Sequence, residues 1–176
     1  MAIQQCLIII KPDGLVKSLT GNIITALSEA KLRIIASKIV KVSRELAEKH
    51  YDRLREEKGE EIFESTLEYI QGKYHTDRVL ALIYHGEDAL SKIRKIAGST
   101  NPEEADPITI RGKYGRINSK TKVFENVVHT SDSEEDAEKE IKLWFAPDEI
   151  TEDVYAVKEI EYADNSGEKI KIKVWK

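Results

Sequence analysis

Apolar positions along the chain form short continuous runs separated by segments with helical spacing. The runs Cys6–Ile10, Val79–Tyr84 and Val123–Val128 predict buried strands. Leu32–Val42 alternates in part and is rich in Ile and Val, so it predicts a fourth strand. Lys11-Pro12-Asp13-Gly14 ends the first run with residues that are typical of a turn.

Apolar residues spaced three and four apart predict the helices between these strands. The predicted helices cover Thr20–Lys31, a segment that begins after Ser43 as N-cap, Lys58–Gln71, Glu87–Ala97 and Ser131–Phe145. In the last of these, Ser131 and Glu134 have the spacing of a capping box. Gly98–Lys122 is long and mostly irregular, and such a loop within a compact domain is usually functional or disordered.

The order of these elements is β-α-β-α-β-α-β within 176 residues, a length that fits one domain. One interpretation is a ferredoxin-like α+β sandwich with an extra helical layer; a doubly wound α/β sheet fits the alternation almost as well. Val157–Trp175 alternates twice around Asn165-Ser166-Gly167 and predicts a C-terminal hairpin. Its first strand is acidic and its second basic, which favours pairing across the hairpin.

Charge and composition narrow the classes of function. Charged residues make up 34% of the chain with interspersed signs and a net charge of −4, which argues against a nucleic-acid surface. No apolar stretch reaches the length of a membrane span, so we expect no membrane partner. The first residues lack a basic segment before an apolar run, and Cys6 is the only cysteine. We therefore expect no intramolecular disulfide and a cytoplasmic location.

Common nucleotide and metal motifs are absent. The sequence contains no Gly-x-x-x-x-Gly-Lys followed by Ser or Thr, and no Gly-x-Gly-x-x-Gly. It contains neither paired Cys-x-x-Cys ligands nor His-Glu-x-x-His, so a protein metal cage is not indicated. His50, His75 and His85 are dispersed and are assigned structural or exposed positions.

His129 is the most suggestive residue, because it lies where a buried strand ends and a helix begins. A helix N-terminus favours anions, so a histidine there could act on a phosphate. Glu140 lies near the apolar stripe of that helix and needs a partner, which a ring nitrogen of the histidine would supply. The alternatives are a histidine that only bridges strand and helix and a glutamate that reaches solvent. Lys11, Arg94 and Arg111 suit a polyphosphate if they converge, which spacing alone does not establish.

The chain resembles the nucleoside diphosphate kinases over about Leu7–Ile150. The similarity is carried by several blocks in a fixed order: Ile10-Lys11-Pro12-Asp13-Gly14, His50-Tyr51, Gly98-Ser99-Thr100-Asn101-Pro102, Thr109-Ile110-Arg111-Gly112, Asn126-Val127-Val128-His129 with Ser131-Asp132, and Ala137-Glu138-Lys139-Glu140-Ile141 before Trp144-Phe145. The resemblance implies a four-stranded antiparallel ferredoxin-like sheet. It also implies reversible γ-phosphate transfer from a nucleoside triphosphate such as ATP to a nucleoside diphosphate, by a ping-pong route through a phosphohistidine at His129.

The same resemblance implies roles for further residues. Ser131 and Glu140 would orient the His129 imidazole, and Tyr51 would lie beside it. The nucleotide would be bound by Lys11, Phe63, Leu67, Arg94, Thr100, Arg111, Val123 and Asn126. Of these, Lys11, Arg94, Thr100 and Arg111 would hold the phosphates, and Lys11 and Asn126 would contact the sugar 3′-hydroxyl. Phe63 would stack on the base, with Leu67 one helical turn on, and Val123 would cover its other face. Mg²⁺ would be held mainly by the nucleotide phosphates, with Asp132 nearby and no direct protein ligand.

The sequence departs from the family pattern at four places. Glu61-Ile62-Phe63 stands where Pro-Phe-Phe is usual, and Pro107-Ile108-Thr109 stands where Pro-Gly-Thr is usual. Extra residues occur around Lys73–Asp77 and around Arg116–Lys122. We expect a nucleoside diphosphate kinase-like domain over residues 1–150, with 151–176 as a hairpin extension of the same domain. The resemblance implies a homo-oligomer, with a hexamer favoured over a tetramer or dimer.

Overall fold

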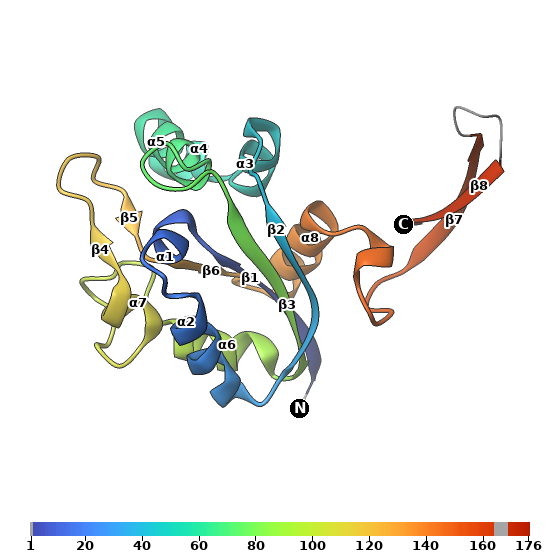
Figure 1. Ribbon diagram of the computed structural model, residues 1–176, viewed down its shortest axis with the longest axis horizontal. Coiled ribbons are helices and arrows are strands. Elements are labelled where there is room, and N and C mark those ends of the chain that lie inside the picture. Colours follow the sequence, from blue (N-terminus) through green and yellow to red (C-terminus); the bar gives the residue numbers. More distant parts are fainter. Residues whose placement is uncertain (1, 164–168) are drawn as a thin grey trace.

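A four-stranded antiparallel sheet forms the centre of the computed structural model, which describes residues 2–163 and 169–176 (Figure 1). Its strands are β1 (Ile3–Ile10), β2 (Arg33–Val40), β3 (Val79–Glu87) and β6 (Val128–Thr130). They are arranged in the order β2-β3-β1-β6, and every neighbouring pair is antiparallel. This order confirms the ferredoxin-like α+β prediction. The doubly wound alternative is wrong, since it requires mostly parallel strands.

Helices cover both faces of this sheet. The crossover helices α2 (Thr20–Leu27) and α6 (Ala89–Ala97) contribute to the core on one face. On the other face lie α3 (Arg44–His50), α5 (Glu60–Ile70) and α8 (Glu134–Trp144). The remaining short elements are α1 (Pro12–Val16), η1 (Ser28–Ala30), α4 (Leu54–Lys58), α7 (Ile110–Tyr114), β4 (Arg116–Ile117), β5 (Phe124–Glu125) and η2 (Pro147–Glu149). Among the described helices, none has the length and apolarity that crossing a bilayer demands.

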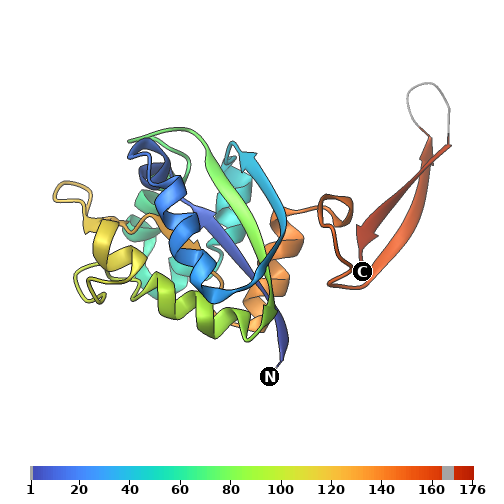
Figure 2. The same ribbon diagram turned by 60° about the horizontal axis from the view of Figure 1, so that its bottom comes forward.

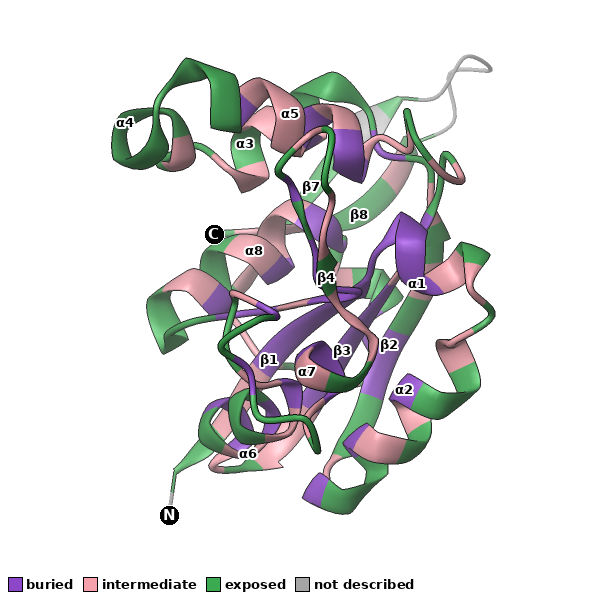
Figure 3. Ribbon diagram, turned by 90° about the vertical axis from the view of Figure 1, so that its left-hand side faces the viewer, coloured by how far each residue is buried: buried purple, intermediate pink, exposed green. Residues whose placement is uncertain are grey.

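The central strand β1 is buried on both faces, as the colouring of Figure 3 makes visible. Its side chains alternate, so Ile8 and Ile10 enter the core under α2 and α6, whereas Leu7 and Ile9 enter the core under α5 and α8. All four are fully buried. Each contributes about 1.5–3 kcal/mol through burial, which explains the continuous apolar run and fixes the position of Lys11 directly after the strand.

The structure corrects two predictions near His129. The predicted strand Val123–Val128 is wrong as a single element, because it divides into β5, a tight turn at Val127 and β6. The predicted helix start at Ser131 is also wrong, because α8 begins at Glu134 and Ser133 is its N-cap. The Ser133 hydroxyl accepts the Asp136 N–H at 3.1 Å, so Ser131 is free for another partner.

Strands β7 (Val157–Ala163) and β8 (Lys169–Trp175) form the predicted C-terminal hairpin, which projects from the body in both Figures 1 and 2. Their register places Glu159 opposite Lys173, as the charge pattern predicted. The predicted turn at 165–167 lies outside the described residues. Near the body, the Trp175 Nε1–H donates to the Phe145 carbonyl at 2.8 Å and the Trp175 ring contacts Tyr155 edge-on. The hairpin is therefore attached through its C-terminal tryptophan.

We expect Trp175→Ala to lower the free energy of unfolding by about 1–2 kcal/mol, because it removes one hydrogen bond and an aromatic contact. Lys173→Ala, on the same strand, is the matched control. Thermal and urea unfolding followed by circular dichroism measures both. Equal stability of Trp175→Ala and the parent would show that the hairpin is a self-contained flap.

Candidate active site

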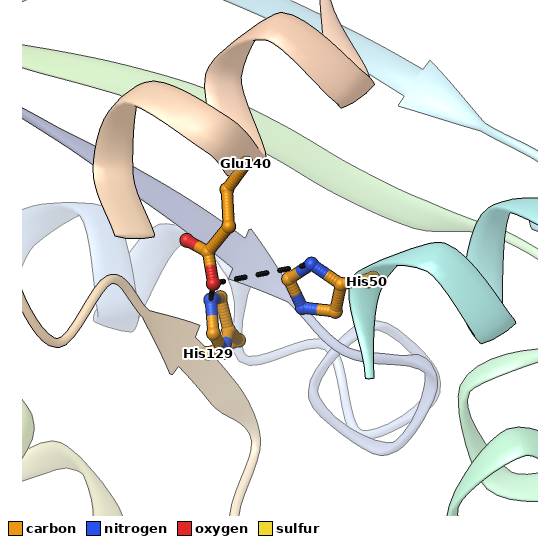
Figure 4. A group of neighbouring side chains, drawn as sticks. All are labelled: His50, His129 and Glu140. Atoms are coloured by element: carbon orange, nitrogen blue, oxygen red, sulfur yellow. Dashed lines mark ion pairs between the residues drawn. The ribbon is translucent and has the colours of Figure 1, made fainter. Parts of the chain in front are cut away.

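His129 lies on β6, where it pairs in register with Ile9 of the buried central strand. Its Nε2 lies 2.9 Å from the Glu140 Oε1 (Figure 4), a contact that becomes an ion pair when the ring takes on positive charge. The other oxygen of Glu140 accepts the Ser131 hydroxyl at 2.6 Å, and the Ser131 Oγ in turn accepts the Leu7 N–H at 3.1 Å. A chain of contacts thus runs from the strand backbone through Ser131 and Glu140 to His129. Because Nε2 faces Glu140, Nδ1 is the ring nitrogen that can react.

Glu140 keeps its charge in this setting. Burial raises the pKa of its carboxyl, but the nearby His129, His50 and Ser131 outweigh burial and hold the pKa below its usual value. An ionised carboxylate beside Nε2 stabilises positive charge on the imidazole ring. Glu140 would therefore stabilise the imidazole when its Nδ1 forms a new bond and the ring becomes positively charged.

His50 joins this group, although the sequence placed it among the dispersed histidines. Its ring meets that of His129 edge-on with centroids 4.4 Å apart, and its Nδ1 accepts the Trp144 Nε1–H at 3.2 Å. Burial and the neighbouring His129 lower the pKa of His50 to about 3. The ring is then neutral with its proton on Nε2, so its 4.0 Å approach to Glu140 is not an ion pair at neutral pH. The family motif His50-Tyr51 could have indicated that His50 belongs to the site.

A strained turn brings Lys11 toward the histidine. Val127 has φ +59°, and the Val128 N–H donates to the Asn126 carbonyl at 2.7 Å, which closes a γ-turn. The Val127 carbonyl faces outward from this turn and accepts the Lys11 N–H at 2.9 Å. Positive φ is unfavourable for a β-branched residue, so tertiary bonding must compensate it. The turn connects the end of β1 to the start of β6.

The Lys11 ammonium group is buried and donates to the Asn126 Oδ1 at 2.8 Å. Asn126 donates in turn to the Thr100 carbonyl at 2.8 Å. No carboxylate of the described residues forms an ion pair with Lys11. Burial and the neighbouring Arg111 lower its pKa to about 7. A buried cation without a counter-ion is the electrostatic arrangement of an anion site.

The two arginines differ in role. Arg111 is buried and donates to the carbonyl groups of Gly98 and Val128, so it holds the backbone around the site. Burial and Arg94 lower the pKa of Arg111 to about 10, which leaves it charged at neutral pH. Arg94 is more exposed and pairs with Asp132. An anion that entered between these residues would have to compete with Asp132 for Arg94.

A cavity of about 360 Å³ opens over His129. The predicted site residues that line it are Lys11, Tyr51, Thr100, Arg111, Asn126, His129, Asp132 and Glu140. Lining residues that the sequence analysis did not select include Lys49, Asp52, Arg53, Leu54, Glu57, Lys58, Asp136 and Lys139. Burial raises the pKa of Tyr51 well above its usual range, and its hydroxyl has no partner among the described residues. A larger hollow of about 540 Å³ lies between α2 and α6 but contains none of the predicted site residues.

Phe63, Leu67 and Val123 do not line this cavity. Phe63 and Leu67 point into the core under the sheet, with 3% and 0% of their surface exposed. Val123 is also buried. Successive helical residues are rotated by about 100°, so the apolar residue just before Phe63, Ile62, is the one that α5 exposes. Because Ile62-Phe63 replaces the usual Phe-Phe pair, the sequence did not indicate which side chains of α5 face outward.

Metal ligation is sterically possible at one group of described residues. One ligand atom from each of His50, His129 and Glu140 lies within 4.8 Å of the others. Two imidazoles and one carboxylate suit zinc-like ions more than Mg²⁺, which prefers oxygen ligands. Asp132 is an exposed carboxylate at the cavity wall, as are Asp52 and Glu57, and an oxygen ligand of this kind suits Mg²⁺.

Beneath the site, Cys6 is buried with its thiol close to Ser131. Burial raises the pKa of this thiol to about 12. It therefore remains protonated and belongs to the core rather than to the chemistry.

Comparison with known proteins identifies the family of the chain. A family model described as "Nucleoside diphosphate kinase" matches residues 4–150. The chain belongs to this family. It is 42% identical over 150 residues to a nucleoside diphosphate kinase of Pyrococcus furiosus, covering 85% of this chain and 88% of the relative. It is 41% identical over 147 residues to that of Listeria monocytogenes serotype 4b (strain CLIP80459), covering 84% and 92%.

Solved structures of the family resemble the fold. The enzyme of Borrelia burgdorferi, a transition-state mimic with bound vanadate and ADP, superposes with a TM-score of 0.78 at 32% identity, covering 86% of this chain and 92% of that one. The apo enzyme of Encephalitozoon cuniculi gives a TM-score of 0.70 at 38% identity, with 88% and 94% covered. The hairpin after residue 150 lies beyond the family match.

The low pKa of Lys11 predicts that ADP binding takes up protons at pH 8. At pH 8 the Lys11 amine of the unliganded protein is mostly neutral, because its pKa is about 7. A bound diphosphate raises that pKa, so the amine takes up a proton. Titration calorimetry in two buffers of different ionisation enthalpy measures the uptake, which should approach one proton per site. Lys11→Met should abolish it. A binding enthalpy that is independent of the buffer in the parent protein would contradict this expectation.

Proposed function

We propose that this protein is a nucleoside diphosphate kinase that moves the γ-phosphate reversibly between nucleotides, with the phosphate carried on His129. The observation that carries the proposal is the Ser131–Glu140–His129 arrangement at a cavity that also holds two buried cations. Family membership indicates the reaction class, and these residues offer a nucleophile, its counter-charge and cations for the phosphates. A binding module without catalysis would have no need for an ionised glutamate behind the histidine.

In the first half-reaction, the lone pair of the His129 Nδ1 forms a bond to the γ-phosphorus. The bond from that phosphorus to the bridging oxygen breaks, and the departing nucleoside diphosphate takes the electron pair. The imidazole becomes positively charged, and Glu140 at Nε2 balances that charge. A second nucleoside diphosphate then attacks the same phosphorus and the steps reverse.

Phosphoryl transfer proceeds through a loose transition state, so positioning and electrostatics supply most of the catalysis. Lys11 and Arg111 line the cavity beside His129 and would stabilise charge on the equatorial oxygens. The protonated Tyr51 hydroxyl offers a donor at the same wall. Thr100 would add a polar contact to the phosphates, and Arg94 would reach them by leaving Asp132.

Mg²⁺ fits this donor set as a companion of the nucleotide. It usually keeps one or two carboxylates together with phosphates and waters, and Asp132 is an exposed carboxylate at the cavity wall. When bound, the ion would neutralise phosphate charge. The residues of the chain would still orient and receive the phosphoryl group.

The base and sugar meet different surfaces. Lys11 and Asn126 line the cavity and would offer polar groups to the sugar. The apolar lining near α4 is Leu54, and an aliphatic contact there would tolerate all four common bases. Phe63, Leu67 and Val123 would reach the base only after the elements that bury them moved.

The assembly and location belong to the same proposal. We retain a homo-oligomer, with a hexamer favoured, and the exposed Ile34 and Ile39 on the edge strand β2 support association. Residues 151–176 would act as an extension of the 1–150 domain. A cytoplasmic location is supported by the single buried thiol.

Incubation with ATP and Mg²⁺ should add one phosphoryl group to His129. Intact-mass measurement at neutral pH detects it, and the adduct should survive alkali and be lost in acid, as nitrogen-bound phosphate is. His129→Ala should show neither the mass increase nor turnover. Glu140→Gln should form the same adduct more slowly, because the ring loses its counter-charge. Full turnover by His129→Ala would end the proposal.

Acceptors that lack the 3′-hydroxyl should react more slowly, on the order of ten- to hundredfold in kcat/KM, because Lys11 and Asn126 would lose a partner. The measurement compares ribonucleoside and 3′-deoxyribonucleoside diphosphates of the same base. Changing the base at constant sugar is the control and should have a smaller effect. Equal rates for both sugars would remove the sugar contact from Lys11 and Asn126.

A further inference from the structure

The two insertions in this chain, near 73–77 and 116–122, contact each other through a buried ionic cluster. Glu125 is 1% exposed and accepts hydrogen bonds from the Arg116 Nε and the Asn118 Nδ2, both at 2.7 Å. The His75 Nε2 lies 3.2 Å from the same carboxylate. The cluster thus joins a turn before β3 to the β4–β5 pair, although fifty positions separate His75 from Glu125.

Each insertion has a local reason for its shape. Gly72 has φ +85°, and a Cβ atom there would lie 2.0 Å from the Thr76 carbonyl oxygen, so only glycine allows the turn that directs His75. In the other insertion, Arg116 pairs in register with Glu125, and Asn118 accepts the N–H groups of Lys120 and Thr121. Two separately folded turns therefore deliver their polar side chains to one carboxylate.

The cluster reaches Lys11 by two routes. Glu125 directly precedes Asn126, which accepts from the Lys11 ammonium group. On the other side, the His75 ring packs edge-on against Tyr69 with centroids 6.3 Å apart. The Lys11 Nζ lies 5.4 Å from the centre of that Tyr69 ring. The Lys11 ammonium is thus held between a tyrosine and an asparagine, and both contact or adjoin the cluster.

Tyr69 is itself fixed, because its hydroxyl donates to the Asp13 Oδ1 at 2.6 Å within the core. Glu125 is ionised: burial raises its pKa, but the bonds from Asn118 and Arg116 outweigh burial and hold the pKa below its usual value. A buried charge with several donors has one favourable geometry and resists displacement. Such a carboxylate is suited to locating the residue that follows it.

We propose that Glu125, braced by His75 and Arg116, is a positioning residue that sets the place of Asn126 and Lys11 and thereby the selectivity for the acceptor sugar. The inference rests on the proposed kinase function. Glu125 does not line the cavity and acts only through its neighbours. A cluster that merely stapled two loops would affect stability and leave sugar selectivity unchanged.

The test compares Glu125→Gln and Arg116→Met with Lys120→Ala, an exposed residue in the same insertion. The quantity measured is the ratio of kcat/KM for an acceptor with the 3′-hydroxyl to that for its 3′-deoxy analogue. Glu125→Gln should reduce this ratio on the order of tenfold, since small misplacements of contact groups are costly. Arg116→Met should reduce it less, and Lys120→Ala should keep the parent ratio.

Phosphohistidine formation in the parent protein with ATP is measured first, so failure of the kinase function is seen separately. Unchanged ratios in folded Glu125→Gln and Arg116→Met would overturn the proposal, even with lowered Tm. Equal loss in all three variants would also overturn it, because the effect would belong to the insertion as a whole. Should Glu125→Gln not fold, Arg116→Met decides alone, since its exposed side chain can be shortened without opening the core.

Discussion

The buried carboxylate of Glu140 is the constraint on which the site depends. A negative charge under 20% exposed would be strongly unfavourable without partners, so both oxygens are occupied, by His129 and by Ser131. Ser131 can serve because the Leu7 N–H fixes its hydroxyl, which ties the site to the central strand. Polar contacts through Ser131 and Glu140 therefore stabilise the pairing of β6 with β1 and the packing of α8 on the sheet, in addition to apolar burial.

The same carboxylate explains why two histidines so close together can differ. His50 stays neutral because burial lowers its pKa, and its Nδ1 accepts from Trp144, so it adds no positive charge beside His129. His129 alone meets Glu140 at ion-pair distance. The surrounding cations, Lys11 and Arg111, face the cavity without carboxylate partners among the described residues. Negative charge thus lies behind the nucleophile at Glu140, and the two positive groups beside it form no ion pair with a carboxylate of the described residues, which favours the approach of a phosphate.

Local patterns predicted most strands and helices but left the ferredoxin-like and doubly wound folds open, and the family resemblance decided between them and indicated most of the predicted residues that line the cavity. The apolar run before Lys11 and the polar block around His129 are visible without a structure. The γ-turn at Val127 was not predictable, since a β-branched residue adopts positive φ only when a distant group, here the Lys11 N–H, stabilises it. The exposure of Ile62 and the burial of Phe63 on α5 were not predictable, because the two apolar residues are adjacent in the sequence. The His75–Glu125 contact joins insertions whose spatial proximity no spacing rule encodes.

The protonated thiol of Cys6 has a consequence beyond packing. It lies one residue from Leu7, whose amide holds Ser131, so an oxidised or alkylated sulfur would disturb the support of Glu140. Peroxides and electrophiles react with thiolates, and a group that ionises only near pH 12 offers almost none. The only cysteine of the chain is therefore unreactive, although it lies next to the residue that supports Ser131. The support that Leu7 gives to Ser131 is thereby kept away from reagents that attack thiolates.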